Sequence, residues 1–285
     1  MKVPKRLRPL VEDGIIDEVL RPLMSGKEAD VFVVRCGSKT RCAKIYKDAV
    51  KRSFKKAAQY TEGRKVRNSR RARAMEKGSK FGRKQQEETW QNAEVDALYR
   101  LERAGVRVPT PYGCFDGVLL MELITDEDGD VAPRLDDVGM SEEQALEDHA
   151  LVMQYVVRML CAGLVHGDLS EFNVLVDEDG PVIIDLPQAV DAAANNNAQA
   201  MLTRDVNKMT DYYSQFAPAL KHTRYAQEIW ELYEEGDLHP DIELTGHAEE
   251  DTHDADVDAV MLEIKAAMEE EQERQERIAA ADDPE

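Results

Sequence analysis

Three oxygen-bearing side chains interrupt an otherwise apolar stretch of this sequence. The segment from Leu164 to Val176 reads LVHGDLSEFNVLV and contributes Asp168 and Asn173, and Asp185 follows at the end of PVIID. A carboxylate and an amide oxygen that lie side by side are hard ligands, suited to Mg²⁺ that keeps some waters and also holds substrate phosphates. Asp168 could accept a proton from an incoming hydroxyl group. The sequence therefore predicts a magnesium site at Asn173 and Asp185 beside a general base at Asp168.

A β-hairpin over residues 173–185 would bring these side chains together. The sequence DEDG (177–180) is typical of its turn. Paired residue numbers in an antiparallel hairpin add up to a constant, here about 357, and Asn173 and Asp185 add up to 358. Opposite side chains are then about 5 Å apart. We therefore expect both ligands at the open end of the hairpin, which the loop containing Asp168 also reaches.

A charged pair is expected to complete the site. Lys44 lies in the middle of a predicted strand, where an exposed lysine has no evident reason to be. Glu94 lies on the apolar face of a helix predicted over 85–104. That face also carries Trp90, Leu98 and Leu101. A charge on an apolar face needs a partner, so we expect a Lys44–Glu94 pair, with Glu87 and Glu102 as weaker candidates. The alternative is that both groups are ordinary surface charges.

The segment Ser25-Gly26-Lys27-Glu28 joins two predicted strands and contains a single glycine. Its backbone N–H groups could bind phosphate oxygens between the strands. The same residues could equally form a plain hairpin turn. The segment does not decide between these two interpretations.

The remaining pattern predicts an α+β fold with a small β-rich part and a mainly helical part. We expect a helical lead-in over 1–24, and then strands at 31–34, 40–47 and 117–124. Ser141 and Gln144 form a capping box for a helix that ends at Gly163. The apolar stripe expected on that helix is Leu146, Ala150, Met153, Val157 and Leu160. Helices are also expected after residue 190.

Charge is distributed unevenly along the 285 residues, whose net charge is −20. Residues 51–84 contain 14 Lys and Arg against two acidic residues, and residues 241–285 contain 17 acidic against three basic residues. The basic window is predicted to be a flexible insertion, and the tail a solvated acidic helix or a disordered segment. Basic arms of this kind bind nucleic-acid backbones, so RNA or a ribosomal particle is a candidate partner. A loop that binds nothing is the alternative.

Several classes of protein do not fit this composition. No run approaches the roughly 18 apolar residues of a membrane span, and the first ten residues lack the apolar core of a secretory signal. The four cysteines show no CxxC pair and no histidines at zinc spacing. We therefore expect a cytoplasmic protein with reduced thiols and no membrane partner.

The spacing His166-x-Asp168-x₄-Asn173, followed by Asp185, resembles the catalytic loop and metal-binding aspartate of protein kinases. His166 is then an anchor of the loop rather than an acid or base. More closely, the sequence resembles the RIO family of atypical protein kinases, and its type-one branch above all. The resemblance covers roughly residues 15–235. It rests on SGKEADVF, AKIYK, LLMELI, LVHGDLSEFNVLV, IIDLPQAV and NNNAQAMLTRDVNKMTDYY.

This resemblance implies a two-lobed kinase-like fold with ATP between the lobes, an N-lobe over about 15–124 and a C-lobe over about 125–240. The implied adenine contacts are Met121, Glu122, Leu123 and Ile184. The implied phosphate contacts are Ser25, Gly26, Lys27, Glu28 and Lys44. Asp168 is then the catalytic base, and Asn173 and Asp185 bind Mg²⁺, with Mn²⁺ as an alternative ion. In this family the metal-binding aspartate, here Asp185, can also accept the phosphoryl group as an aspartyl-phosphate.

The predicted function is phosphoryl transfer from ATP to Ser or Thr of proteins, including this chain. Four hydroxyl groups are available in the basic window, those of Ser53, Thr61, Ser69 and Ser79. The predicted domains are 1–240 for the kinase-like part and 241–285 for the tail. DLP stands where most protein kinases have DFG, and no APE segment follows. The alternatives are a small-molecule phosphotransferase of the aminoglycoside or choline kinase type and an ATP-gated switch that binds RNA or ribosomal particles.

Overall fold

The computed structural model describes residues 3–26, 29–47 and 93–248. The predicted basic insertion 51–84, Lys27, Glu28 and Trp90 lie outside the described residues, as does most of the predicted tail. The chain divides into two compact units, Met1–His247 and Ala248–Glu285. In the first unit, Ile242 and Leu244 pack against the larger hydrophobic core. The division into a domain 1–240 and a tail 241–285 stays a prediction.

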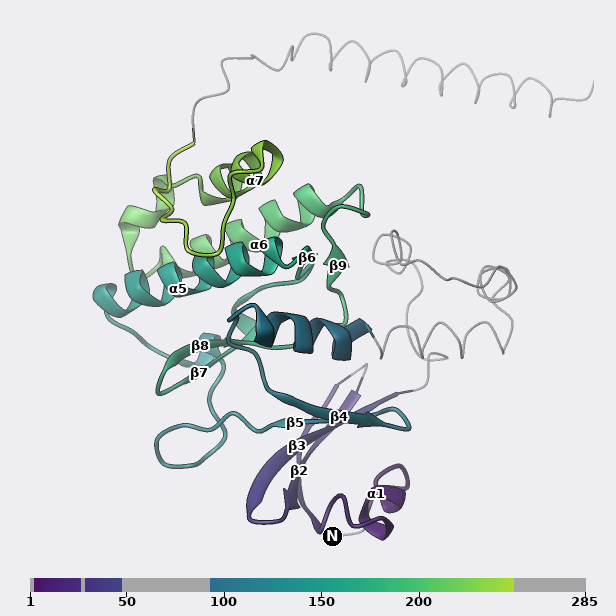
Figure 1. Ribbon diagram of the computed structural model, residues 1–285. Helices are drawn as coiled ribbons and strands as arrows, with labels where there is room; N and C mark the ends of the chain where they lie inside the picture. The colour runs from purple at the N-terminus through teal and green to yellow at the C-terminus, as the bar shows by residue number, and fades with distance from the viewer. Residues whose placement is uncertain (1–2, 27–28, 48–92, 249–285) are drawn as a thin grey trace, which may run out of the picture. The chain divides into compact units, whose positions relative to one another are not determined.

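A five-stranded antiparallel sheet forms the N-terminal part (Figure 1). Its spatial order is β1-β2-β3-β5-β4. The strands are β1 (Glu18–Ser25), β2 (Ala29–Cys36), β3 (Lys39–Tyr46), β4 (Pro111–Phe115) and β5 (Val118–Glu122). The three strands predicted for this region are therefore confirmed as β2, β3 and β5.

Two predictions for this part are wrong or incomplete. The helical lead-in is confined to α1 (Arg8–Glu12), and the residues after Asp17 form β1 instead. Pro22 is compatible with a strand here because β1 is at the edge of the sheet, and irregular register on both sides of it hides the alternating pattern. The strand β4 was not predicted. Its signal was the pair Asp116-Gly117, whose positive φ angles of 47° and 79° form the tight turn to β5.

The two faces of β3 have different tasks. Side chains alternate between the faces of a strand, so Ala43 and Ile45 enter a small core that is shared with α1. Lys44 and Tyr46 point to the opposite face, where the helix over residues 93–103 presents Glu94. This helix ends at Gly105, which has φ +76°. A single strand thus builds the hydrophobic core with one face and the polar site with the other.

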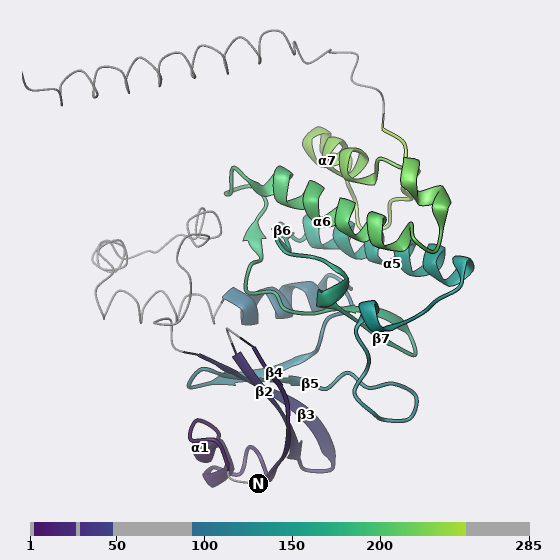
Figure 2. The ribbon, with the colours of Figure 1, turned by 180° about the vertical axis from the view of Figure 1, so that it is seen from behind.

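The C-terminal part is mainly helical. The longer helices are α5 (Glu142–Cys161), α6 (Ala198–Tyr213) and α7 (Tyr225–Glu235). Short 3₁₀ segments are η3 (Leu135–Asp137), η4 (Glu171–Asn173) and η5 (Pro218–His222). Two small strand pairs complete it: β6 (Leu164–Val165) with β9 (Val190–Asp191), and β7 (Val174–Asp177) with β8 (Gly180–Ile183). The helices α5 and α6 lie side by side in both views (Figures 1 and 2).

The helix α5 begins and ends where the sequence predicts. The amide of Gln144 donates to Ser141 Oγ at 3.1 Å, and Gly163 follows the helix with φ +75°. The predicted apolar stripe is only partly correct, because Leu146 and Ala150 are exposed. In the first half of α5 the buried residues are Ala145, Asp148 and His149. The neighbouring helices cover only that face there, whereas the second half of α5 is buried more widely.

The hairpin β7–β8 has the predicted register. Val174 pairs with Ile183 and Asp177 with Gly180, so the paired numbers add up to 357. The strands are displaced slightly from the predicted ones, since Asn173 ends η4 and Asp185 lies beyond β8. Asn173 and Asp185 therefore flank the open end of the hairpin. Among the described residues, no helix combines the length and apolar character needed to cross a membrane.

Candidate active site

Lys44 connects three separate elements at the centre of the site. Its Nζ lies 2.7 Å from Glu94 Oε1 and 2.7 Å from Asp185 Oδ1. Lys44 and Glu94 are 8% and 2% exposed. Burial alone would lower the pKa of Lys44, but the two carboxylates outweigh it and hold that pKa above its ordinary value. The predicted Lys44–Glu94 pair is confirmed, and the lysine stays charged.

A tyrosine that was not predicted completes the buried pair. The hydroxyl of Tyr46 donates a hydrogen bond to Glu94 Oε2, so both carboxylate oxygens of Glu94 have partners from β3. Burial and the adjacent Glu94 carboxylate raise the pKa of Tyr46 well above its usual value, which keeps the phenol protonated. The signal was the i, i+2 spacing of Lys44 and Tyr46, which places both on one face of a strand.

A closed ring of four hydrogen bonds fixes the loop from His166 to Asn173. The amide of Asp168 donates to His166 Nδ1 at 3.2 Å, so His166 Nε2–H donates to the carbonyl of Ile184 at 3.1 Å. The amide of Ile184 donates to the Asn173 carbonyl at 3.0 Å. Asn173 Nδ2 closes the ring on the Asp168 carbonyl at 2.8 Å. The ring thus brings Asp168 and Asn173 together beside Ile184, the residue before Asp185, and His166 anchors the loop as predicted.

Asp185 lies directly after this ring and has an unusual backbone conformation. Its φ is +65°, one of two positive values at non-glycine residues in the described part of the chain. The side chain is 43% exposed, although Oδ1 is bonded to Lys44. Burial would raise the pKa of Asp185, but Lys44 lowers it overall. The carboxylate is therefore ionised and partly open to solvent.

The residues present fit a hard divalent cation. Asn173 Nδ2 donates to the Asp168 carbonyl, which leaves Asn173 Oδ1 as an acceptor. Asp185 Oδ1 accepts from Lys44, which leaves Asp185 Oδ2 as a second possible ligand. The described residues contain no cluster of three His, Cys, Asp or Glu side chains that could hold a metal. A cation at Asn173 and Asp185 would therefore take its other ligands from water and phosphate oxygens, as Mg²⁺ usually does.

The carboxylate of Asp168 is accessible at the edge of the loop. Its side chain is 47% exposed, and Lys208 Nζ from α6 lies 3.7 Å from Asp168 Oδ1. The loop from Asp168 to Asn173 has the sequence DLSEFN, which contains no lysine. Lys208 was not predicted. It supplies a positive charge beside the expected base from a separate element.

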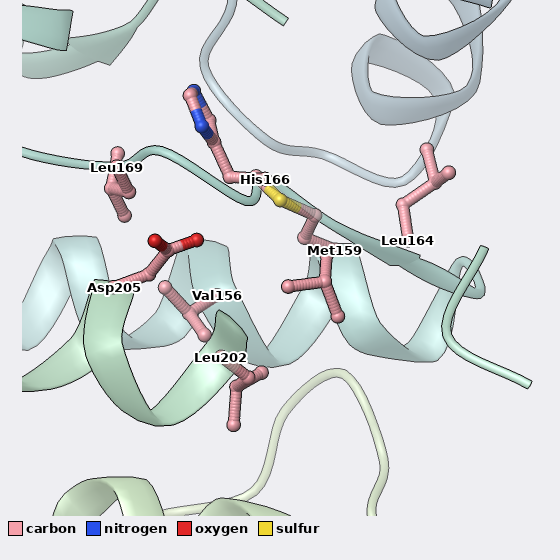
Figure 3. A pocket seen from close by; sticks show the side chains of 8 residues that line it. Val156, Met159, Leu164, His166, Leu169, Leu202 and Asp205 are labelled. Carbon is pink, nitrogen blue, oxygen red and sulfur yellow. The ribbon is translucent and has the colours of Figure 1, made fainter. Parts of the chain in front are cut away.

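A buried carboxylate supports the loop from below. Asp205 of α6 is 2% exposed, and its Oδ2 accepts the Gly167 amide at 2.7 Å. Asp205 lies under the loop between Leu169 and His166, beside a cavity of about 10 Å³ (Figure 3). Burial raises the pKa of Asp205, and nearby positive and N–H groups offset this only in part. Asp205 was missed, although an aspartate among the apolar positions of α6 was a usable signal.

The residues expected to contact the adenine lie in different environments. Glu122, which ends β5, bonds through its carboxylate to Arg107 at 3.0 and 3.2 Å. Arg107 also reaches Asp177 on β7 at 2.9 Å. Burial would raise the pKa of Glu122, but Arg107 and the Thr110 amide lower it overall. The Glu122 side chain is therefore part of a bridge between the sheet and the hairpin, which the sequence did not predict.

The other expected adenine contacts, Met121, Leu123 and Ile184, are half-buried. Of these, Met121 packs against the larger hydrophobic core. Ile184 lies within the hydrogen-bonded ring described above. These positions leave apolar surface near both β5 and the hairpin end, as an adenine site would need.

The described residues on both sides of the predicted phosphate loop, at the end of β1 and the start of β2, are held together by hydrogen bonds. Ser25 Oγ donates to Asp30 Oδ1 at 2.6 Å, and Gly26 N donates to the Ala29 carbonyl at 2.9 Å. Lys47, which follows β3, contacts Asp30 at 2.8 Å and the Gly26 carbonyl at 2.7 Å. Lys27 and Glu28 lie outside the described residues, so their predicted contacts with phosphate stay predictions.

The comparisons with known proteins agree with this fold. A family model described as the RIO domain matches residues 30–226. The RIO-type serine/threonine-protein kinase Rio1 of Haloferax volcanii is 37% identical over 205 residues, covering 72% of this chain and 66% of that protein. Serine/threonine-protein kinase RIO1 of Homo sapiens is 33% identical over 223 residues, covering 78% of this chain and 36% of that protein.

A solved structure extends the likeness to the fold. The Rio2 kinase–ADP/Mg²⁺–phosphoaspartate complex from Chaetomium thermophilum has a TM-score of 0.52 at 22% identity, covering 73% of this chain and 59% of that one. This confirms the predicted kinase-like α+β fold, with a β-sheet N-terminal part and a helical C-terminal part. The chain belongs to the RIO domain family. It spans between about a third and two thirds of the length of the two curated relatives.

Proposed function

We propose that this chain transfers the γ-phosphoryl group of ATP to Ser or Thr hydroxyl groups of proteins, itself included. One observation carries the proposal. Lys44 is held at 2.7 Å between Glu94 of the helix over 93–103 and Asp185 beside the hairpin. This arrangement directs a fixed positive charge toward the partly open Asp185 carboxylate, where phosphate and a cation would meet. The names of the relatives support the same activity.

Each residue then has a defined task. Lys44 orients the phosphates, and Asn173 Oδ1 with Asp185 Oδ2 would hold Mg²⁺, which neutralises phosphate charge when bound. The acceptor hydroxyl oxygen forms a bond to the γ-phosphorus while the bond from that phosphorus to the β,γ-bridging oxygen breaks. The hydroxyl proton passes to Asp168. ADP leaves, and the acceptor keeps the phosphoryl group.

The adenine and phosphate contacts remain parts of this proposal. Met121, Leu123 and Ile184 supply apolar surface for the adenine, and the backbone of Glu122 lies beside it. The turn at Ser25 and Gly26, continued by Lys27 and Glu28, is proposed to cover the phosphates. Mn²⁺ is a proposed substitute for Mg²⁺, because both accept carboxylate and amide oxygens.

The test is labelling with ATP and Mg²⁺ of the wild-type chain and two variants. We expect the wild type to incorporate label, with part of it within residues 51–84. Asp168→Asn should lower the rate by about 10²–10⁴-fold, the contribution usual for a positioned base, while ATP affinity changes little. Equal labelling by the wild type and Asp168→Asn would refute the assignment of the base. Equal labelling by Lys44→Met would refute the phosphate contact.

A second candidate is an ATPase cycle through Asp185 itself. It is favoured by the 43% exposure of the Asp185 side chain, and the similar Rio2 kinase structure is an ADP/Mg²⁺–phosphoaspartate complex. A carboxylate oxygen of Asp185 would attack the γ-phosphorus with loss of ADP, and water would then release phosphate. Label at Asp185 should be removed by hydroxylamine and should be absent from Asp185→Asn. Label that resists hydroxylamine entirely would contradict this cycle.

The class of small-molecule acceptors, the nucleic-acid partners and the location of the protein are separate proposals. A small-molecule phosphotransferase is disfavoured by the family match, and a screen of small alcohols as phosphoryl acceptors would detect it. Binding of RNA or ribosomal particles rests on the charge of residues 51–84 alone. A pull-down of ribosomal precursors with and without this segment would test it. We also propose a cytoplasmic location, in keeping with four free cysteines.

A further inference from the structure

A second cavity lies beside the expected base and has no task in the proposed transfer. Its volume is about 300 Å³. The walls come from the loop before β7 and from α6, and include Ser170, Glu171, Phe172, Lys208, Asp211 and Tyr212. We call this cavity the side pocket. Lys208 belongs to it and lies 3.7 Å from Asp168, so the side pocket and the expected base are neighbours.

Phe172 gives the side pocket an exposed aromatic face. The residue is 51% exposed, the largest value among the exposed large hydrophobic residues of the described chain. It lies directly before the proposed metal ligand Asn173, within η4. An aromatic ring there offers a surface for the aliphatic stem or the cationic head of a Lys or Arg side chain.

Acidic groups surround the side pocket. Glu171 and Asp211 line it. The Tyr212 hydroxyl donates to the carbonyl of Leu135, the first residue of η3, which also contains Asp136 and Asp137. Burial raises the pKa of Tyr212, and the charges of Asp136, Glu171 and Asp137 raise it further. The one lysine of the lining, Lys208, faces the Asp168 carboxylate. The pocket is therefore negative, and it would repel a phosphate backbone.

We propose that the side pocket binds a Lys or Arg side chain of the protein segment whose Ser or Thr is presented to Asp168. This inference rests on the proposed function and deepens it, because it assigns a class of substrate: basic-flanked hydroxyl residues. An extended chain advances about 3.3–3.6 Å per residue, so the basic residue is expected within a few residues of the hydroxyl. The sequence of this chain contains such a segment, RKVRNSRRARA (64–74), with Ser69 between Arg67 and Arg70.

Direct binding tests the side pocket apart from phosphoryl transfer. The probe is the synthetic peptide RKVRNARRARA, in which alanine replaces the acceptor serine, measured by fluorescence anisotropy with the full-length chain. The comparison peptide has every Lys and Arg replaced by Gln. The test variant is Glu171→Gln/Asp211→Asn. The matched control, Glu234→Gln/Glu235→Gln, removes two exposed charges from α7.

We expect the wild type and the control to bind the basic peptide at least about tenfold more tightly than the Gln peptide. The affinity of the test variant for the basic peptide should be about two- to thirty-fold lower, the range for the loss of two partly exposed ion pairs. Added salt should weaken the wild-type complex. Phe172→Ala should weaken binding without changing its dependence on salt. Circular dichroism spectra establish that each variant is folded.

Two results of the binding experiment would overturn the proposal: equal affinity of the wild type for the two peptides, or equal affinity of the test variant and the control for the basic peptide. Phosphoryl transfer is then measured with the serine-containing peptide, where the test variant should raise KM and leave kcat within about twofold, as loss of uniform binding does. Binding without any transfer would refute the proposed function and leave the side pocket supported. Transfer that ignores the basic residues would refute the side pocket alone.

Discussion

Removal of the Glu94 carboxylate tests the buried centre of the site most directly. In Glu94→Ala, Lys44 loses one of its two anionic partners and the Tyr46 hydroxyl loses its acceptor. Breaking a buried ion pair costs about 3–5 kcal/mol. Asp185 still contacts Lys44 and is partly exposed, so the lower end applies, about 3 kcal/mol. At about 2–4 °C per kcal/mol for a domain of this size, the melting temperature should fall by about 6–12 °C.

Tyr46→Phe separates the contribution of the Tyr46 hydroxyl to stability from that of the Lys44–Glu94 ion pair. It removes one hydrogen bond to a charged group, worth about 1.5–3 kcal/mol. Because the Tyr46–Glu94 contact is counted in both single variants, the double variant should cost less than the sum by about 1 kcal/mol or more. Urea unfolding of the four proteins gives the free energies. Glu102→Ala, an exposed residue of the same helix, is the matched control and should change stability by less than about 0.5 kcal/mol.

The same variants should separate catalysis from stability. Glu94→Ala should lower kcat/KM by at least about tenfold, because Lys44 is then oriented only by Asp185. Tyr46→Phe should have a smaller effect in the same direction. The reasoning is refuted if Glu94→Ala costs under about 1 kcal/mol of unfolding free energy, the ordinary effect of a surface change, or if it leaves kcat/KM at the wild-type value.

Three further outcomes follow from the described contacts. Arg107→Met leaves the carboxylates of Glu122 and Asp177 without their shared partner and should cost about 1–3 kcal/mol of unfolding free energy, with a raised KM for ATP in steady-state kinetics. Asp205→Ala removes the acceptor under the loop and should lower kcat by at least about tenfold at unchanged peptide affinity. Burial lowers the pKa of His149 to about 4, so the unfolded state binds the proton first and stability falls as pH drops from about 6.5 to 4. In His149→Gln, urea midpoints should decline less over that range, and an equal decline would contradict the assignment.

The parts of the site that were predictable depend on short-range pattern. The register of β7–β8 follows from its two-residue turn, because such a turn fixes every later pair. The buried position of Glu94 follows from helical spacing against Leu98 and Leu101. By contrast, β1 escaped prediction because Pro22 and two irregular pairings interrupt its alternation.

The residues that were missed act across long sequence separations. Arg107 joins Glu122 to Asp177, and nothing near Arg107 in the sequence indicates either partner. Lys208 approaches Asp168 only because α6 packs against the loop. Asp205 is the exception, since a charged residue between Leu202 and Val206 of an apolar helix face already calls for a buried partner.

The backbone at Asp185 yields a last prediction. The left-handed φ of +65° costs an ordinary residue about 1 kcal/mol or more, and Asp and Asn tolerate it best. Both neighbours are fixed, since Ile184 bonds through its amide and its carbonyl and Leu186 is buried. The fixed neighbours therefore hold Asp185 in the left-handed conformation, and in this conformation its carboxylate contacts Lys44.

Asp185→Asn and Asp185→Ala should thus behave differently. Both lose the charge that faces Lys44, so both should be inactive in the labelling assay. Asparagine keeps the left-handed preference, whereas alanine does not, so Asp185→Ala should unfold at lower urea, with a difference of about 1 kcal/mol. Asp185→Gly separates the backbone effect from the side-chain effect, because glycine relieves the backbone strain and also lacks the carboxylate. It should therefore be about 1 kcal/mol more stable than Asp185→Ala, which is the backbone part of the loss. If the alanine variant is as stable as the asparagine variant, the backbone at residue 185 is not strained and its φ angle needs another cause.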